Sequence, residues 1–297
     1  MHKVTKAPLG ASLIVLASFF YASYGIWTKL MGDFFEGYTA SALRSVLVVL
    51  LLLPVAFAFR RFQPLKLKQN WRYILGLFTA ALFTWGPLYY AILHAGVGIS
   101  LTVNYACLII GALLFGRLFG GERFTKDKAI SAALGFVGMC LIFTPGTSSF
   151  GWLPLTAAAI SGLSIGAVMV CSRQIQYNST QTTLVLWVTS ALASGAMALI
   201  LQEQMPVIAL HIEWLHLVFF SVASVAASWA LVRGLKLIDA GAAGLLGLLE
   251  IVFGVAFGIL LFHERPGILV LFGAIVIILA AAIPYIKDYR TKQGTVA

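Results

Sequence analysis

Two long stretches without a charged side chain, residues 73–116 and 129–172, constrain the fold of this chain most. Each stretch is 44 residues long and holds no Asp, Glu, Lys or Arg. About 20 apolar residues cross the hydrocarbon core of a bilayer as a helix, so each stretch is long enough for two crossings. Helices are one of the two structures that satisfy every backbone polar group inside lipid. The sequence therefore predicts an all-α integral membrane protein.

The composition agrees, because 61% of the 297 residues are hydrophobic and only 10% are charged, unlike a water-soluble domain. Turn-forming residues at 95–98 and 144–149 divide the two long stretches. Shorter uncharged runs supply the remaining crossings. We expect ten transmembrane helices, near residues 11–30, 39–59, 72–93, 97–118, 128–144, 151–173, 180–202, 213–236, 240–262 and 266–286.

The positions of Lys and Arg predict the orientation of the helices. With the N-terminus inside, 17 of the 20 basic residues fall in cytoplasmic segments, as the positive-inside rule requires. The first helix precedes further crossings and lacks a small-residue cleavage site, so we expect it to be retained. Both termini are then cytoplasmic. Topology accounts for the net charge of +10, so we expect a lipid bilayer and no nucleic acid as partner.

The chain also repeats itself with an offset of 142 residues. The segment GERFTKDKAISAALG contains Glu122, and HERPGILVLFGAIVI contains Glu264 at the same place. An offset of 141 aligns Gly10 and Ser23 with Gly151 and Ser164. These matches predict two five-helix repeats, residues 1–145 and 146–297. Because five is odd, the second repeat is inverted, and inverted repeats place a binding site near the midplane between them.

The motifs of the two repeats resemble the EamA type of the drug/metabolite transporter (DMT) superfamily. They are "GE-R" and "HER" at the ends of Gly/Ala-rich helices, "ALR" ending at Arg44, and "AG-A-LL--LE" ending at Glu250. The segment "VNY", which ends at Tyr105, resembles the YddG-like amino acid exporters. The resemblance covers essentially the whole chain. One departure is Ile251, where the family often has proline after the glutamate.

The resemblance implies that six helices of the two repeats surround a central cavity. It would bring eight side chains within reach of one space: Tyr24, Trp85, Tyr89, Asn104, Ser164, Ser228, Trp229 and Glu250. Tyr105 adds to the aromatic character of this candidate substrate site. For a single Ser, hydrogen bonding to a neighbouring helix is the alternative role.

Glu250 lies about eleven residues into its predicted helix, close to the bilayer midplane at a rise of 1.5 Å per residue. Burial at that depth favours the neutral form of a carboxyl, so we expect Glu250 to couple protons to transport. The alternative is a structural carboxyl that hydrogen-bonds a neighbouring helix or pairs with Arg44 or Lys29. Gly162 and Gly166, like Gly254 and Gly258, are spaced for close helix packing.

Enzyme chemistry finds no support, since GxSxG, HExxH and P-loop motifs are absent. The three Cys lack CxxC spacing, so we expect no metal and no cofactor. We predict a secondary active transporter of the cell inner membrane that uses alternating access. The resemblance implies export of amino acids or similar small metabolites, and the depth of Glu250 favours coupling to protons. The alternatives are cationic drug efflux, nucleotide-sugar exchange, a channel, and a membrane partner or sensor protein.

Overall fold

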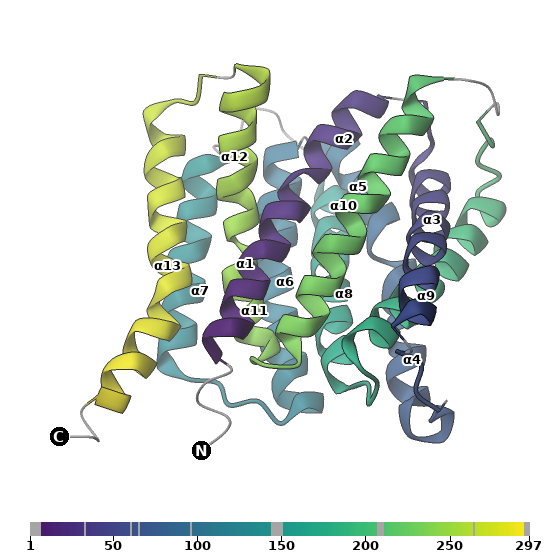
Figure 1. Cartoon of the computed structure of the whole chain (residues 1–297). Helices are drawn as coiled ribbons and strands as arrows, with labels where there is room; N and C mark the ends of the chain where they lie inside the picture. The colour runs from purple at the N-terminus through teal and green to yellow at the C-terminus, as the bar shows by residue number, and fades with distance from the viewer. Residues whose placement is uncertain are drawn as a thin grey trace.

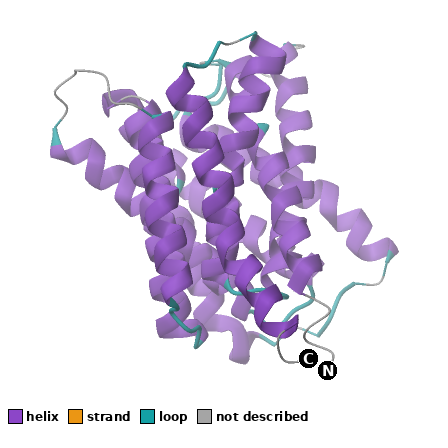
Figure 2. Ribbon diagram, turned by 90° about the vertical axis from the view of Figure 1, so that its left-hand side faces the viewer, coloured by secondary structure: helices purple, strands orange, loops and turns teal. Residues whose placement is uncertain are grey.

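The computed structural model describes residues 7–32, 34–59, 61–64, 66–95, 97–143, 151–206, 211–263 and 265–293. Every regular element in these ranges is a helix (Figure 1, Figure 2). The thirteen helices are α1 (Ala7–Ala22), α2 (Tyr24–Met31), α3 (Gly37–Ala58), α4 (Leu67–Leu82), α5 (Trp85–Ala95), α6 (Val97–Gly120), α7 (Lys126–Ile142), α8 (Trp152–Gln174), α9 (Ser179–Ile200), α10 (Ile212–Leu235), α11 (Ala240–Gly247), α12 (Leu249–Phe262) and α13 (Ile268–Gln293).

Eight helical spans among the described residues are long and apolar enough to cross a membrane. Three of them are consecutive helix pairs: α1 with α2, α4 with α5, and α11 with α12. The apolar part of α13, Ile268–Ile283, is shorter, and α7 has 17 residues with three charged side chains in its first turn. The prediction of an all-helical membrane protein is confirmed, and its helix ends agree with the structure to within a few residues, except for the start of α4 and the end of α13. The predicted turn at 144–149, the repeat boundary and Glu264 lie outside the described residues.

Three predicted helices are interrupted in the middle, which the sequence analysis did not anticipate. In the span predicted at 72–93, α4 ends at Leu82 and α5 begins at Trp85. Pro87 explains this break, since it has no N–H to donate to the Phe83 carbonyl and its ring clashes with that carbonyl. Between α11 and α12 the chain breaks at Leu248 even though Ile251 stands in place of the family's proline. The third break lies at Ser23.

The helices pack in pairs around a central group. α3 packs against α9, α7 against α13, α1 against α10, and α8 against α6, α4 and α5. In Figure 1, α7, α12 and α13 form one side of the molecule and α3, α4 and α9 form the other, with α1, α6, α8, α10 and α11 between them. The largest apolar core surrounds α11, with Leu245 and Leu248 fully buried in it.

The closest packing occurs between α6 and α8, as the glycine spacing predicted. A Cβ on Gly162 would collide with the Asn104 carbonyl oxygen, and one on Gly166 would lie 2.5 Å from the Ala112 nitrogen. The same prediction is wrong for Gly254, whose added Cβ would meet no described atom within 4 Å.

The start of α1 and the end of α13 lie at one end of the molecule, drawn at the bottom of Figure 1. We call it the lower end. It also carries the α6–α7 connection, residues 121–125, and the α10–α11 connection, residues 236–239. The connections between α2 and α3 and between α12 and α13 lie at the opposite, upper end.

Candidate functional site

The helix breaks are held by polar side chains from neighbouring helices. Ser161 on α8 donates a hydrogen bond to the Thr84 carbonyl at the α4–α5 break, with a 2.5 Å separation. Asn104 on α6 donates in turn to the Ser161 hydroxyl at 2.9 Å and to the Ala158 carbonyl at 3.3 Å. These bonds join α5, α6 and α8 at one place. A carbonyl freed by a helix break is therefore satisfied inside an apolar structure.

The other two breaks also carry side-chain hydrogen bonds, one from a neighbouring helix and one within the same segment. Ser18 donates to the Leu246 carbonyl at 3.4 Å, which links α1 to α11 just before its break. The Ser23 hydroxyl donates to the Phe20 carbonyl at 2.6 Å. Discontinuous helices of this kind form the substrate and ion sites of many membrane carriers. The region where they meet is accordingly the candidate functional site.

Arg44 lies beside two of these breaks, inside a box of four aromatic rings. Its side chain is 2% exposed, and its Cζ atom is 4.5 Å from the ring centroids of Trp85 and Phe220, 5.1 Å from that of Tyr24 and 5.4 Å from that of Trp187. Its Nε has no hydrogen-bond partner. Ring faces attract a cation. The box therefore favours a charged guanidinium without neutralising it.

Tyr24, Trp85 and Phe220 of this Arg44 box also contact one another through Tyr24, and a hydrogen bond holds Trp187. Tyr24 stacks on Trp85 with centroids 6.5 Å apart and meets Phe220 edge-on at 4.5 Å. Trp187 donates from Nε1 to the Ser228 hydroxyl at 2.8 Å. The Tyr24 hydroxyl is buried without a hydrogen-bond partner, and the nearby Ser224 donates its own proton to the Phe220 carbonyl.

Glu250 stands at the start of α12, two residues after the break at Leu248. It interacts with the Tyr105 hydroxyl of α6, and Tyr21 and Tyr24 lie within electrostatic range of it. In the described part of the chain no ion pair joins Glu250 to Arg44. Of the two structural alternatives, the contact with a neighbouring helix is present and the pairing with Arg44 is not.

The structure brings four of the predicted site residues together: Tyr24, Trp85, Tyr105 and Glu250. Each is only partly buried. Two others, Asn104 and Ser228, are fully buried and bonded to neighbouring helices, Asn104 to α8 and Ser228 to α9. Asn104 and Ser228 therefore hold the helices around the site together.

Three predicted residues lie apart from this cluster. Tyr89 is 47% exposed and its ring covers Gly37 at the start of α3. The Ser164 hydroxyl donates to the Ile160 carbonyl of its own helix at 2.8 Å. Trp229 faces a different hollow, at the lower end. Sequence periodicity places residues on a helix face but does not say which neighbour that face meets.

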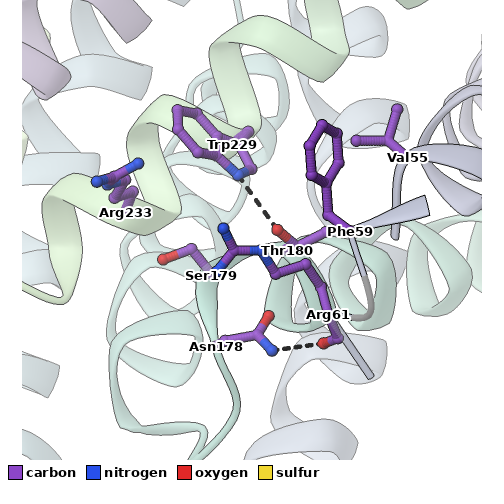
Figure 3. Close-up of a pocket in the computed structure, with 8 residues that line it drawn as sticks. All are labelled: Val55, Phe59, Arg61, Asn178, Ser179, Thr180, Trp229 and Arg233. Carbon is purple, nitrogen blue, oxygen red and sulfur yellow. Dashed lines mark hydrogen bonds between the residues drawn. The ribbon is translucent and has the colours of Figure 1, made fainter. Parts of the chain in front are cut away.

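The hollow at Trp229 has a volume of about 360 Å³ and lies between α3, α9 and α10 (Figure 3). Trp229 donates to the Thr180 hydroxyl at 3.4 Å, and the guanidinium of Arg233 lies 5.0 Å from its ring centroid. Asn178 donates to the Arg61 carbonyl at 2.5 Å on the opposite wall. The hollow is thus a basic crevice near the lower surface, separate from the Arg44 box.

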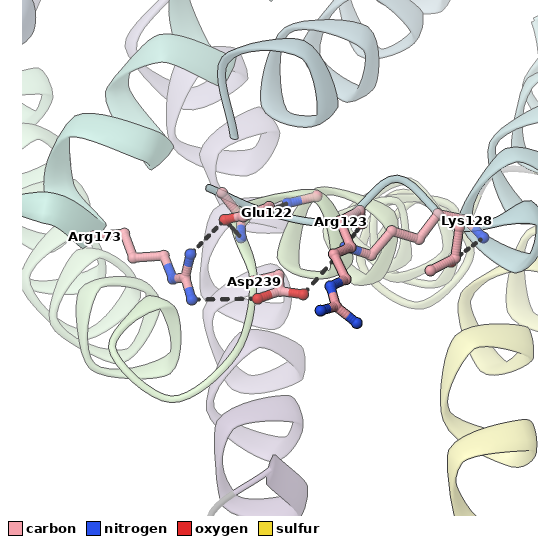
Figure 4. A network of polar contacts seen from close by, with 8 residues as sticks. Glu122, Arg123, Lys128, Arg173 and Asp239 are labelled. Carbon is pink, nitrogen blue, oxygen red and sulfur yellow. Dashed lines mark hydrogen bonds and ion pairs between the residues drawn. The ribbon is translucent and has the colours of Figure 1, made fainter. Parts of the chain in front are cut away.

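A network of four charged side chains connects several helices at the lower end (Figure 4). We call Glu122, Lys128, Arg173 and Asp239 the lower-end network. Arg173 on α8 binds Glu122 at 2.7 Å and Asp239 at 3.2 Å. Lys128 on α7 binds the other oxygen of Asp239 at 3.1 Å. The network therefore connects α7 and α8 to the α6–α7 and α10–α11 connections.

Glu122 is the buried centre of this network, with 4% of its side chain exposed. It accepts hydrogen bonds from the backbone N–H groups of Ala240 and Gly241, at 2.7 and 3.1 Å. These groups begin α11, where the helix dipole favours a negative charge. A Cβ on Gly116 would lie 2.7 Å from a Glu122 oxygen, so glycine makes room for the carboxylate.

Lys236 strengthens the same end by capping α8. Its ammonium donates to the carbonyls of Arg173 and Ile175, at 3.1 Å for Arg173. Burial, together with the nearby Arg173 charge, lowers the pKa of Lys236 to about 8. It is therefore mostly charged at neutral pH.

Sequence reasoning missed the role of Arg44 and the lower-end network. It noted Arg44 only as the end of a motif and as a possible partner for Glu250, although Arg44 lies inside α3 as the eighth of its 22 residues. The available signal was its lone charge within residues 37–58. The network joins residues as far apart in sequence as Glu122 and Asp239, which are separated by 117 positions. No local sequence pattern therefore predicts it.

Chemically, the cluster offers a cation and a carboxyl that are not paired with each other, surrounded by aromatic rings. This arrangement suits binding of a small polar molecule. Among the described residues no group of three or more His, Cys, Asp or Glu side chains is placed to hold a metal ion.

Comparison with solved structures supports the fold. A crystal structure of a protein superposes with a TM-score of 0.76 and 19% sequence identity, covering 95% of this chain and 98% of the other. At that identity the likeness concerns the fold alone.

Comparison with curated proteins finds transporters. An uncharacterized transporter of Helicobacter pylori (strain J99) is 27% identical over 173 residues, which are 56% of each chain. The chloramphenicol-sensitive protein RarD of Pseudomonas aeruginosa is 35% identical over 77 residues, 26% of this chain and 23% of RarD. The matched region thus spans about half the length, or less, of these curated relatives.

The model of the EamA-like transporter family matches this chain twice, at residues 8–144 and 152–285. Together the two matches include nearly all the described helices. The chain belongs to the EamA-like transporter family, within the drug/metabolite transporter superfamily.

Proposed function

We propose that the protein is a secondary active carrier that exports amino acids or similar small metabolites across the cell inner membrane. The observation that carries this proposal is the meeting of interrupted helices at a cluster that holds a buried guanidinium, Arg44, and a carboxyl, Glu250, that form no ion pair with each other. Helix breaks near the bilayer midplane are a device by which carriers present polar groups to a substrate. The family membership supports transport, and the cluster indicates where the substrate binds.

Ten crossings in two inverted repeats, residues 1–145 and 146–297, form part of this proposal. The packing supports it. After α9, Glu203 accepts hydrogen bonds from the N–H groups of Tyr38 and Thr39 at the start of α3, at 3.1 and 2.6 Å. After α3, Gln63 accepts one from Asn178 at the start of α9, at 3.2 Å. The segment that follows α9 thus caps the start of α3, and the segment that follows α3 caps the start of α9.

These two caps stand at equivalent positions of the repeats. Tyr38 and Asn178 are 140 residues apart, as are Gln63 and Glu203. One cap lies at the upper end and the other at the lower end, as an inverted pair requires. The α7–α13 pair joins the last helices of both repeats in the same way.

Alternating access requires that the two ends open in turn, and the ends differ in chemistry. By the repeat offsets, Arg173, Asp239 and Lys128 correspond to Gly32, Val97 and Val270, which carry no charge. We place the lower end in the cytoplasm because 17 of the 20 basic residues fall there. The lower-end network then holds the cytoplasmic side closed by ion pairs that Gly32, Val97 and Val270 cannot form at the upper end.

The aromatic rings around the cluster suit a substrate with an apolar or aromatic side chain. Glu250 is the proposed proton-coupling residue, since its carboxyl is unpaired and close to a helix break. Arg44 disfavours the alternative of cationic drugs, because a buried positive charge repels a cation. The same residue favours a second candidate, exchange of an anionic metabolite such as a nucleotide sugar.

Counterflow in proteoliposomes tests the proposal. Liposomes loaded with unlabelled compound are diluted into a trace of the labelled compound, across a panel of amino acids, amines and nucleotide sugars. We expect transient accumulation of apolar and aromatic amino acids. Non-saturable flux without counterflow would indicate a channel, and absence of flux with the whole panel would contradict the proposed substrates.

A further inference from the structure

Arg44 carries a buried charge that nothing in the described part of the chain neutralises. No Asp or Glu forms an ion pair with it there, and its Nε has no hydrogen-bond partner. Removing a charge from water is costly unless it is paired and hydrogen-bonded. Four aromatic rings offset part of that cost through their faces, but they accept no conventional hydrogen bond. The guanidinium fork is therefore incomplete without an anion.

Other features of the box also point to an anion. The Tyr24 hydroxyl, whose ring packs on the guanidinium, is a second buried group without a hydrogen-bond partner. Tyr24 is the first residue of α2, and Trp85 is the first residue of α5. Two of the rings around Arg44 thus stand directly after a helix break.

We propose that Arg44 and the Tyr24 hydroxyl bind the carboxylate of the transported substrate. This assignment rests on the proposed carrier function and names the chemical group that the site recognises. A guanidinium binds a carboxylate through two parallel N–H···O bonds, one of which uses Nε when the anion approaches from that side. Tyr24 donates a third hydrogen bond.

The helix breaks explain how a substrate reaches a residue that is 2% exposed. Tyr24 follows the break at Ser23, and Trp85 follows the break at Phe83–Thr84. Trp187 and Phe220 stand on the uninterrupted helices α9 and α10, and Trp187 is held by Ser228. Bending at the two breaks moves Tyr24 and Trp85 away from Arg44, while the other two rings stay in place.

Amino acids fit this arrangement better than simple acids do. Tyr24 lies within electrostatic range of both Arg44 and Glu250. A zwitterion thus finds a cation and a carboxyl near the same ring. Recognition of the carboxylate by Arg44 and of the ammonium by Glu250 would orient the substrate across Tyr24.

The test uses the purified full chain in detergent and the tryptophan fluorescence of the box, to which Trp85 and Trp187 contribute. Three probes separate the charges: phenylacetate carries only the carboxylate, phenethylamine only the ammonium, and L-phenylalanine both. We expect saturable binding of phenylacetate and L-phenylalanine, and binding of phenethylamine that is roughly 10- to 100-fold weaker than that of L-phenylalanine.

Arg44→Gln should abolish the difference between L-phenylalanine and phenethylamine and remove saturable binding of phenylacetate. The matched control is Arg72→Gln, since Arg72 also lies over a tryptophan ring, that of Trp71, but is exposed. It should bind all three probes as the unmodified protein does. If Arg44→Gln does not fold, Arg44→Lys and Tyr24→Phe decide instead, and each should weaken phenylacetate binding several-fold.

Three results would overturn the proposal. They are phenylacetate binding by Arg44→Gln within twofold of the unmodified protein, no saturable response of the unmodified protein to either carboxylate, and saturation by inorganic phosphate alone. If Arg44→Gln does not fold, phenylacetate binding left unchanged by both Arg44→Lys and Tyr24→Phe overturns it as well. The outcome of the counterflow experiment is independent of the outcome of this binding experiment. If no amino acid is transported but phenylacetate binds through Arg44, the proposed substrates are wrong and the carboxylate site remains.

Discussion

At the scale of single residues, Glu250 and Arg44 are the two charges that the fold keeps near its centre without joining them in an ion pair. A charge inside the bilayer costs at least about 2.5 kcal/mol on insertion scales, so such groups mark transport pathways more often than structural positions. Tyr105 contacts Glu250, and the aromatic box encloses Arg44. The two groups are thus stabilised separately and remain available to other partners.

Glu250→Gln tests proton coupling. Glutamine keeps the size and the hydrogen bonding of the carboxyl but cannot titrate. We expect proton-driven accumulation to fall to the level of protein-free liposomes, while exchange without a pH gradient persists and loses its pH dependence. Glu250→Asp should retain part of the coupled activity. A glutamine variant that accumulates substrate with unchanged pH dependence would assign Glu250 a packing role.

Trp85 and Tyr89 form a matched pair of aromatic residues one turn apart on α5. Trp85 packs on Arg44 and Tyr24, whereas Tyr89 is exposed against Gly37. Trp85→Ala should therefore raise the apparent KM for aromatic amino acids about tenfold, the equivalent of one lost ring contact. Tyr89→Ala should change it less than twofold. Equal effects in a transport assay would mean that ring burial in the box does not determine substrate affinity.

At the scale of helices, the α6–α8 contact depends on two glycines. In Gly162→Ala the new Cβ would press on the α6 backbone at Asn104, and overpacking of this kind costs about 1 to 3 kcal/mol. The control is Gly254→Ala, where the added Cβ meets open space and alanine improves helix propensity by up to about 1 kcal/mol. Thermal unfolding in detergent should show a lower Tm for the first variant only.

The lower-end network makes a second prediction at this scale. Arg173→Gln removes both ion pairs of Arg173 and leaves the buried Glu122 with two backbone partners, a loss of about 2 kcal/mol. The lower end should then open more often. The control is Arg123→Gln, because Arg123 is exposed in the α6–α7 connection, next to Glu122.

Thiol labelling measures this opening. Leu113→Cys, in a variant without the native cysteines, places a thiol beneath Gly241 and close to the network. A water-soluble maleimide should label it faster when Arg173→Gln is added and at an unchanged rate when Arg123→Gln is added. Equal rates in all three proteins would show that the network does not control access.

At the scale of the whole molecule, orientation can be tested by labelling single cysteines from outside intact cells. Cysteines at Met205 and Gly151, which are exposed near the upper end, should react with an impermeant maleimide. Cysteines at Lys66 and Lys126, which are exposed at the lower end, should react only after permeabilisation. Labelling of either lower-end cysteine in intact cells would contradict the proposed cytoplasmic placement.

Helix identity and approximate bounds were predictable because a bilayer-spanning helix needs a long apolar run, which any reader of the sequence can find. The breaks were harder. Pro87 predicts one of them, but Ser23 and Leu248 have no comparable signal. A hydrogen bond from Ser18 of another helix reaches the chain before the break at Leu248, and the Ser23 hydroxyl bonds the preceding turn of its own helix. A predicted site residue lies in the central cluster where its helix face points toward that cluster, as for Trp85. It lies outside the cluster where its helix face points elsewhere, as for Tyr89.

The sequence alone determined that the chain is helical, embedded in a membrane and built from two similar halves, because hydropathy, charge placement and internal repetition are properties of the chain order. Tertiary structure decided which charges meet. Whether Arg44 pairs with Glu250 or stands alone in a ring of aromatic side chains depends on how six separate helices, α2, α3, α5, α9, α10 and α12, cross one another. That crossing is set by packing between residues far apart in sequence, so no pattern along the chain records it.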